Sequence, residues 1–298
     1  MMLKPKASRI RNLTRCIAAI VSLAMLAACS FSQLTVRMSQ PLIDGGTQAL
    51  YRESDLDLAQ AAFPPNIELI EGMLVNDPGN QRLQEYAAQA YYGYAFGFVE
   101  DENPQRAGQL YRRGMEHGLR ALQIAGFDPA TQQANQDTFD KSVKQLDADA
   151  VAALFWTSSN LAKWIDLNRD QLDAIDQLPK AVSMMQRVLD LDERFFLAGP
   201  HIFMGVYYGG RPPLLGGDFR LAEQHFDRAR TLTQHKILII DVIQAQYFEV
   251  QRNDRDRFHK LLTGVLEAPD NLDPDQALSN AIAKRKAKRL LEQENQWF

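Results

Sequence analysis

The sequence predicts an all-α fold, an irregular array of tetratricopeptide-like helical repeats that forms an α-solenoid. Three observations support this prediction. Apolar residues recur at three- and four-residue spacing along most of the chain, alternating strand patterns are nearly absent, and matched small and aromatic residues recur in paired helices. The 298 residues are 46% hydrophobic and 23% charged, which is the composition of an ordinary globular protein.

Residues 1–28 have the pattern of a lipoprotein signal peptide. The first fifteen residues contain five basic side chains and no acidic one, and the apolar run "CIAAIVSLAMLAAC" follows. This run matches the roughly 7–15-residue apolar region of a secretory signal and is shorter than the roughly 20 residues that span a bilayer. Its ending "LAAC" resembles a bacterial lipobox, so Cys29 is predicted to be lipidated and to become the N-terminus after cleavage. The alternative is an ordinary signal peptide in which Cys29 is incidental.

The predicted mature chain is acidic and exported. Cleavage would remove five of the 33 basic residues and none of the 37 acidic ones, which argues against nucleic acid as a partner. Cys29 would be its only cysteine, so we expect no disulfide framework. The residue after the lipidated cysteine is Ser30. An Asp at this position would resemble the inner-membrane retention signal of Gram-negative lipoproteins, so Ser favours the outer membrane. We expect residues 29–54 to form a tether and a first helical segment, and residues 55–298 to form the tetratricopeptide-like helical domain.

Amphipathic segments predict the helices of this domain. The apolar spacing is clearest at 83–99, 106–122, 150–165, 180–191 and 220–232. The apolar stretch 236–250 resembles a strand, but it is too long and lacks turn signals, so we predict a helix there. Asp147 and Asp149 are candidate caps of the 150–165 helix, and Asp273 is expected to cap a helix that starts near Pro274.

Matching positions recur in pairs of helices. The clearest pair has Gly205 and Tyr208 in its first helix and Ala222, Phe226 and Ala229 in its second. An earlier copy has Gly93 and Phe96, followed by Ala107, Tyr111 and Gly114. Small residues let two helices approach closely, and the aromatic residues fill the space between them. Because the copies are degenerate and unevenly spaced, we expect a distorted array rather than a regular superhelix.

Motifs for catalysis, cofactors and metals are not found in the sequence. The five histidines lack metal-ligand spacing, and no G-x-S-x-G elbow or phosphate-binding loop is present. We therefore predict no catalytic residues, no cofactor and no metal, and expect that the protein is not an enzyme. The basic run "AKRKAKRL" at 283–290 is interpreted as a solvated face of a C-terminal helix.

Two aromatic features are candidates for a ligand pocket. Trp156, Asn160, Lys163 and Trp164 share one side of a predicted helix, and aromatic walls with a few polar groups are typical of ligand sites. The alternative is a pair of core tryptophans beside a surface lysine. The stretch "EYAAQAYYGYAFGF" at 85–98 is aromatic on several faces, so it is either buried on several sides or lines a cavity.

The stretch "YYGGRPPLLGGDF" at 207–219 interrupts the clearest repeat. Glycine and proline both disfavour helix, so it is predicted to be a long turn, with Asp218 capping the next helix. We expect the turn to fold over a cavity and place Tyr207, Tyr208 and Arg211 near its rim, where Arg211 would meet the polar head of an amphipathic ligand. The alternative is that the two leucines of the turn plug the hydrophobic core.

The mature chain resembles the T component associated with TRAP transporters, a periplasmic tetratricopeptide-like lipoprotein. The resemblance rests on "IELIEGMLVNDPGNQRL", "AAQAYYGYAFGFVE", "RAGQLYRRG", "ALFWTSSNLAKWIDL", "GPHIFMGVYYGGRPPLLGGDFRLAEQHFDRA" and "LSNAIAKRKAKRLL". It implies an all-helical subunit with a pore through each protomer, self-association as a trimer, and partnership with a periplasmic substrate-binding P component. It also implies small hydrophobic or amphipathic cargo. The only functional residue that the resemblance carries over is the lipidated Cys29, and it assigns no ligand-binding residue.

Two functions of different classes follow from these observations. The first is a lipid-anchored accessory subunit of a TRAP-type system on the periplasmic side of a bacterial membrane, which binds or passes a ligand together with the P component. The alternative is a non-enzymatic tetratricopeptide scaffold lipoprotein in outer-membrane or cell-envelope assembly. A channel lined by aromatic residues would favour the first, and a solid core with an exposed concave groove would favour the second.

Overall fold

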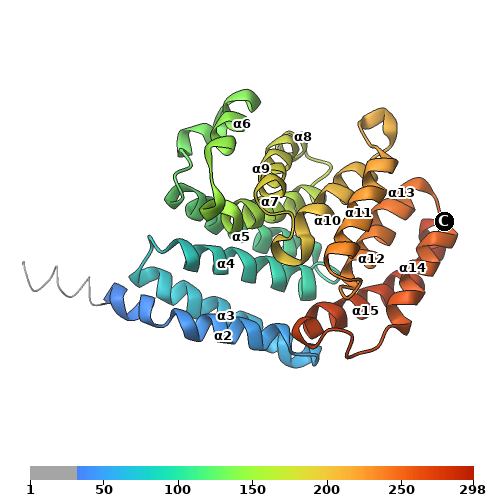
Figure 1. Cartoon of the computed structure of the whole chain (residues 1–298), viewed down its shortest axis with the longest axis horizontal. Coiled ribbons are helices and arrows are strands. Elements are labelled where there is room, and N and C mark those ends of the chain that lie inside the picture. The colour runs from blue at the N-terminus through green and yellow to red at the C-terminus, as the bar shows by residue number, and fades with distance from the viewer. Residues whose placement is uncertain (1–31) are drawn as a thin grey trace, which may run out of the picture.

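The computed structural model describes residues 32–298, and the predicted signal peptide and Cys29 lie outside this range. All regular structure within residues 32–298 is helical, so the all-α prediction is confirmed (Figure 1). The finer prediction of tetratricopeptide repeats stays a prediction. Asp218 and Asp273 cap a helix and a helical turn by accepting a hydrogen bond from a backbone N–H, as expected. Asp147 caps the short 3-10 turn Ala148–Ala150, whereas the helix Val151–Asp166 begins at Ala150 without a side-chain cap, so the expected capping of this helix by Asp147 or Asp149 is wrong.

The N-terminal half contains α2 (Gln40–Tyr51), α3 (Leu56–Asn76), α4 (Gln81–Tyr94), α5 (Pro104–Ile124), α6 (Gln136–Gln145), α7 (Val151–Asp166) and α8 (Leu172–Ile175). The C-terminal half contains α9 (Leu178–Leu191), α10 (Phe195–Gly209), α11 (Phe219–Leu232), α12 (Ile239–Gln244), α13 (Val250–Arg252), α14 (Arg255–Glu267), α15 (Ala277–Glu292) and α16 (Glu294–Trp297). Two π-helical turns extend α4 and α12, at Ala95–Val99 and Ala245–Glu249. The stretch 236–250 is thus helical from Ile239 onward, as predicted.

Neighbours in sequence are neighbours in space along most of the chain. Helix α4 packs between α3 and α5, α5 packs on α7, α7 on α9, and α10 on α11. Close approach depends on small residues. A Cβ at Gly205 would lie 2.9 Å from the Phe226 ring, and one at Gly114 would lie 2.4 Å from the Asn160 side chain. These positions come from the predicted repeat pattern, so that pattern does mark close helix packing.

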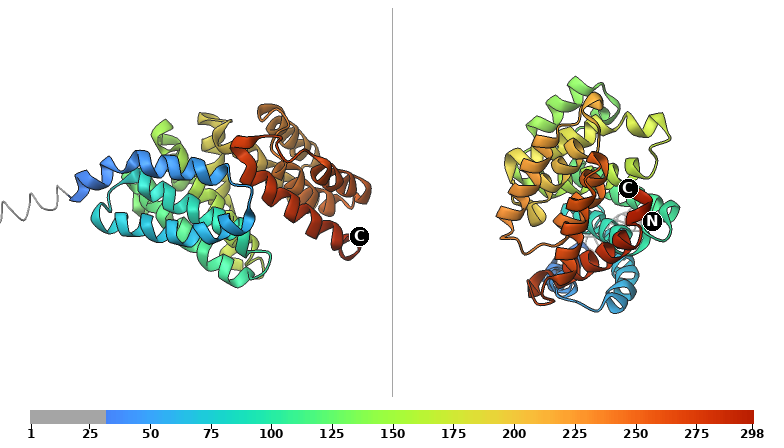
Figure 2. Two further views of the ribbon diagram at one scale, coloured as in Figure 1. Left: turned by 90° about the horizontal axis from the view of Figure 1, so that it is seen from below. Right: turned by 90° about the vertical axis from the view of Figure 1, so that its right-hand side faces the viewer.

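The long helix α15, close to the C-terminus, returns to the beginning of the array. It packs against α2 and α3, and its approach to them is visible at the bottom of Figure 1 and from below in Figure 2. An ion pair between Arg52 and Asp275 (2.8 Å) joins the same two regions. The helices therefore enclose a central space instead of forming an open superhelix.

Residues 32–51 belong to this packed structure. Residues 32–38 and α2 are helical, Val36 is buried in a cluster with Ile70 and Leu83, and Arg37 pairs with Asp77 at 3.0 Å. Within the expected tether and first helical segment of residues 29–54, residues 32–51 are thus helical and packed on the array, and the division of the chain into domains stays a prediction.

Candidate ligand cavity

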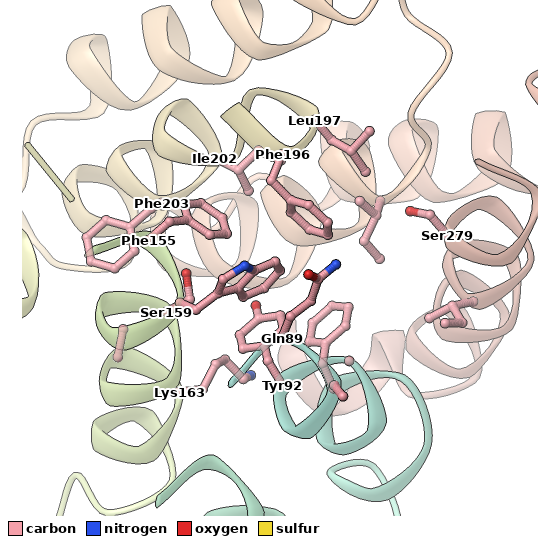
Figure 3. Close-up of a pocket in the computed structure, with 18 of the residues that line it drawn as sticks. Gln89, Tyr92, Phe155, Ser159, Lys163, Phe196, Leu197, Ile202, Phe203 and Ser279 are labelled. Carbon is pink, nitrogen blue, oxygen red and sulfur yellow. The ribbon is translucent and has the colours of Figure 1, made fainter. Parts of the chain in front are cut away.

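A cavity of about 750 Å³ occupies the central space, lined by side chains from α2, α3, α4, α7, α10, α12 and α15. Its lining is mostly aromatic and aliphatic, as Figure 3 shows for part of the wall. This volume lies within the roughly 300–1,000 Å³ typical of small-molecule sites. The size and chemistry of the space therefore suit a ligand with a substantial apolar part.

Trp156 is the centre of the aromatic wall. Its ring lies 4.5 Å from the Phe196 ring, 4.8 Å from Phe155 and 5.6 Å from Tyr92, measured between centroids. Tilted and edge-to-face contacts of this kind stabilise a rigid apolar surface. The four side chains come from α4, α7 and α10, so the wall exists only in the folded chain. Figure 3 labels three of them, Tyr92, Phe155 and Phe196.

An unusual backbone turn places Phe196 on that wall. Phe196, Leu197 and Ala198 have φ values of 40°, 62° and 58°, in the left-handed region that non-glycine residues rarely adopt. Such a conformation persists only where surrounding packing holds it. Phe196 and Leu197 both line the cavity, which indicates that contacts across the cavity wall hold the turn.

A buried ammonium group interrupts the apolar lining. The Lys163 Nζ atom lies 2.8 Å from a Glu100 oxygen and 3.0 Å from the Tyr247 hydroxyl oxygen, which in turn donates to Asp166 at 2.7 Å. Burial by itself lowers the pKa of Lys163, but the Glu100 carboxylate, followed by Tyr247, overrides burial and raises this pKa well above its usual value. The lysine is therefore charged, and it is not the surface lysine of the alternative interpretation.

A second lysine reaches Glu100 from the opposite side. Lys286 on α15 is 4% exposed, and its Nζ lies 2.9 Å from Glu100 and 2.9 Å from Asp101. Burial raises the pKa of Glu100, but Lys163 and then Lys286 outweigh burial, and the net pKa is lowered. The interpretation of 283–290 as a solvated face is therefore wrong at Lys286, because its charge is paired inside the protein.

The loop after α10 lies at one side of the cavity. Arg211 stacks on the Tyr207 ring at 3.9 Å, donates from Nε to the Tyr207 carbonyl (3.0 Å) and from Nη2 to the Gly216 carbonyl (3.3 Å). Arg211, Tyr207 and Leu215 all line the cavity. Leu214 is 97% exposed and Leu215 is 69% exposed, so the alternative in which both leucines plug the core is wrong.

The family of this chain follows from a comparison with known protein families. The sequence model of the TRAP transporter T-component family matches residues 52–298. The chain belongs to this family. No curated protein matches the chain. Members of the family are accessory subunits of transport systems and are not known as enzymes.

This T component brings together four of the seven predicted ligand residues. Trp156, Lys163, Tyr207 and Arg211 line the cavity. The other three have packing roles away from the lining: Asn160 donates to the carbonyls of Ala88 and Trp156, Trp164 packs between two core clusters, and Tyr208 stacks on His225. A ligand-binding role for any of the seven stays a prediction.

Sequence reasoning missed much of the T-component cavity. Phe155, Phe196 and Phe203 on α7 and α10, and Tyr247 on the second π-helical turn, were not among the predicted residues. The aromatic density of 85–98 was a usable signal, since Tyr92 and Phe96 do line the cavity while Tyr91 is core. Within residues 32–298, no helix is long and apolar enough to cross a membrane, and no group of side chains is arranged to hold a metal ion.

Proposed function

We propose that this T component is a lipid-anchored periplasmic subunit that binds a small hydrophobic or amphipathic molecule and passes it on together with a substrate-binding P component. The observation that carries the proposal is the 750 Å³ cavity with an aromatic wall around Trp156. Lipidation of Cys29 and an outer-membrane location belong to the same proposal and rest on "LAAC" and Ser30.

Cavity chemistry favours transfer over a purely structural role. A scaffold gains stability from filling its core, because apolar side chains that face empty space forfeit dispersion contacts. Here Trp156, Phe196 and Phe203 face a space large enough for a ligand. The cost of leaving that space open is offset if a ligand fills it during the working cycle.

Occupancy of the cavity can be tested with an uncharged apolar dye. The soluble chain, without signal peptide, is titrated with N-phenylnaphthylamine, whose fluorescence rises in apolar surroundings. Ala162 lines the cavity, so Ala162→Phe fills part of it and should weaken dye binding at least about tenfold. Ala130→Phe adds the same ring at an exposed position outside the lining and should change nothing. Equal dye binding by all three proteins would contradict a ligand cavity.

The anchor and the partner need separate tests. Cys29→Ala should release the protein from membranes in a fractionation assay while its helical content is unchanged, and equal membrane retention would contradict lipidation.

The purified soluble chain should sediment as a trimer and co-purify with a periplasmic P component. A strict monomer over a broad concentration range, without such a partner, would favour the scaffold alternative.

A further inference from the structure

A second hollow adjoins the aromatic cavity at the α10 loop. It has a volume of about 570 Å³. Four of its lining residues, Ile175, Leu178, Tyr207 and Arg211, also line the main cavity, so the two spaces share a wall. The remaining lining residues are Ala134, Gln136, Asp176, Pro179 and Lys180. We call this second hollow the annex.

Two cations of the annex have no carboxylate partner within the part of the chain that the structure describes. Arg211 donates to the carbonyls of Tyr207 and Gly216. Lys180 donates to the carbonyl of Gln132 at 2.6 Å and lies 5.5 Å from the Phe139 ring centroid. An arginine has five N–H donors and a lysine has three, so most of the donors on these two groups are available.

The two other cations that line the main cavity differ from Arg211 in this respect. Lys163 pairs with Glu100 and Asp166, and Arg169 pairs with Asp166. The annex holds one carboxylate, Asp176, which is exposed and forms no ion pair with Arg211 or Lys180. The annex therefore carries net positive charge, whereas the charges of the main cavity other than Arg211 are paired.

We propose that the annex binds the anionic head group of an amphipathic ligand whose apolar tail lies in the aromatic cavity. The head group is a carboxylate, sulfate or phosphate monoester, because each offers the planar or tripod oxygens that arginine and lysine bind best. This inference rests on the proposed function and narrows its ligand class to anionic amphipaths.

The loop geometry supports a fixed position for the arginine. The Arg211 guanidinium is stacked on the Tyr207 ring. This contact restricts rotation of the guanidinium, so its N–H groups point outward past the edge of the ring. Gly216 has φ of 83°, and a Cβ at Gly217 would lie 2.0 Å from the Arg211 carbonyl oxygen. The second glycine pair thus lets the loop close tightly on Arg211, which accounts for glycines at this point of the sequence. A preorganised donor costs less to bind than a mobile one.

Ligands that share one tail and differ in head charge test this inference. Dodecanoate, dodecanol and dodecylammonium are each titrated against the soluble chain with bound N-phenylnaphthylamine, at low and at high salt. The displacement of the dye gives the affinity of each amphipath. We expect dodecanoate to bind about tenfold or more tightly than dodecanol at low salt, with dodecylammonium weakest and the preference reduced by salt. Arg211→Gln and Lys180→Gln should each weaken dodecanoate about tenfold, leave dodecanol within about twofold, and together abolish the preference.

Lys141→Gln provides the matched control, since it removes one nearby surface charge outside both hollows. It should leave all three affinities unchanged. Equal binding of dodecanoate and dodecanol by the unmodified chain would overturn the anionic head group while leaving the proposed function intact. A preference for dodecanoate that survives the double substitution would overturn the annex as its site. Failure of every amphipath and of the dye would instead contradict the proposed function itself.

Discussion

Two π-helical turns meet at Lys163, and each is associated with a buried glutamate. The turn Ala95–Val99 places the Phe96 ring 5.7 Å from the Lys163 Nζ and is followed by Glu100. The turn Ala245–Glu249 places the Tyr247 hydroxyl 3.0 Å from the same Nζ and ends at Glu249. Turns of this kind re-aim side chains within a helix and are frequent at functional sites. Here both contribute an aromatic residue to the cavity lining.

Their glutamates differ in the charge that surrounds them. Glu100 lies between two ammonium groups, and its pKa is lowered. Glu249 accepts from the Gln244 amide at 2.6 Å and from the Arg252 guanidinium at 2.5 Å. Burial dominates at Glu249 and raises its pKa. The comparison teaches that one cation and an amide do not offset the desolvation of this carboxylate, whereas two lysines and a tyrosine hydroxyl do at Glu100.

Removing the charge of Glu100 should have the largest effect on stability. Glu100→Gln leaves Lys163 and Lys286 buried with less compensation, and breaking one side of a buried ion pair costs about 3–5 kcal/mol. Urea unfolding of the soluble chain, followed by circular dichroism, measures this loss. A loss below about 1 kcal/mol would mean that Asp101 and Asp166 compensate both lysines without Glu100.

Removing one of the two lysines should make Glu100 resemble Glu249. Lys286→Met keeps most of the length of the side chain and leaves Glu100 with a single ammonium partner. We expect a loss of about 2 kcal/mol at neutral pH and a higher pKa for Glu100. Lys288→Met, an exchange on the same helix at a position without a buried ion pair, is the control. An equal loss of stability in the two variants would show that the Lys286 charge stabilises the fold no more than an exposed lysine on the same helix does.

The contributions of Glu100 and Glu249 to the free energy of unfolding should change with pH in opposite directions. The folded pKa of Glu100 lies below the usual 4.5, so its contribution is present above pH 4.5 and is lost as the pH falls through the folded value. The folded pKa of Glu249 lies above 4.5, so its ionisation destabilises the fold as the pH rises from 4.5 through the folded value. The difference between the parent chain and Glu100→Gln should therefore grow with pH, by at most about 1.4 kcal/mol per pH unit. The difference for Glu249→Gln should change in the opposite direction.

The sequence predicted what is decided locally. Helix positions, the caps at Asp218 and Asp273, and the close contact at Gly205 follow from neighbouring residues and were identified correctly. Tyr207 near the end of α10 and Arg211 in the turn after it do line the cavity, whereas Tyr208 does not.

Features decided by distant residues were not predictable. Lys286 looked solvated within its basic run, yet its partner Glu100 is 186 positions away in the chain. The left-handed turn at Phe196 and the two π-helical turns carry no local signature, since ordinary helical sequence can adopt them when distant packing requires it. These turns place four residues on the cavity wall, and the aromatic density of 85–98 marks only the first of them: Phe96, Phe196, Leu197 and Tyr247.

The smallest effect is expected at Glu249, and it sharpens the comparison most. Glu249→Gln removes a charge whose burial outweighs its pairing, while the new amide oxygen can still accept from Gln244. Arg252 keeps Glu223 and Asp254 as partners at 3.2 Å and 3.1 Å. These changes oppose each other, so stability at neutral pH should change by about 1 kcal/mol or less in either direction. Urea unfolding alongside Glu100→Gln gives the ratio of the two effects. If both variants lose the same stability, a single guanidinium stabilises a buried carboxylate as well as two ammonium groups do, and the distinction drawn between the two π-helical turns fails.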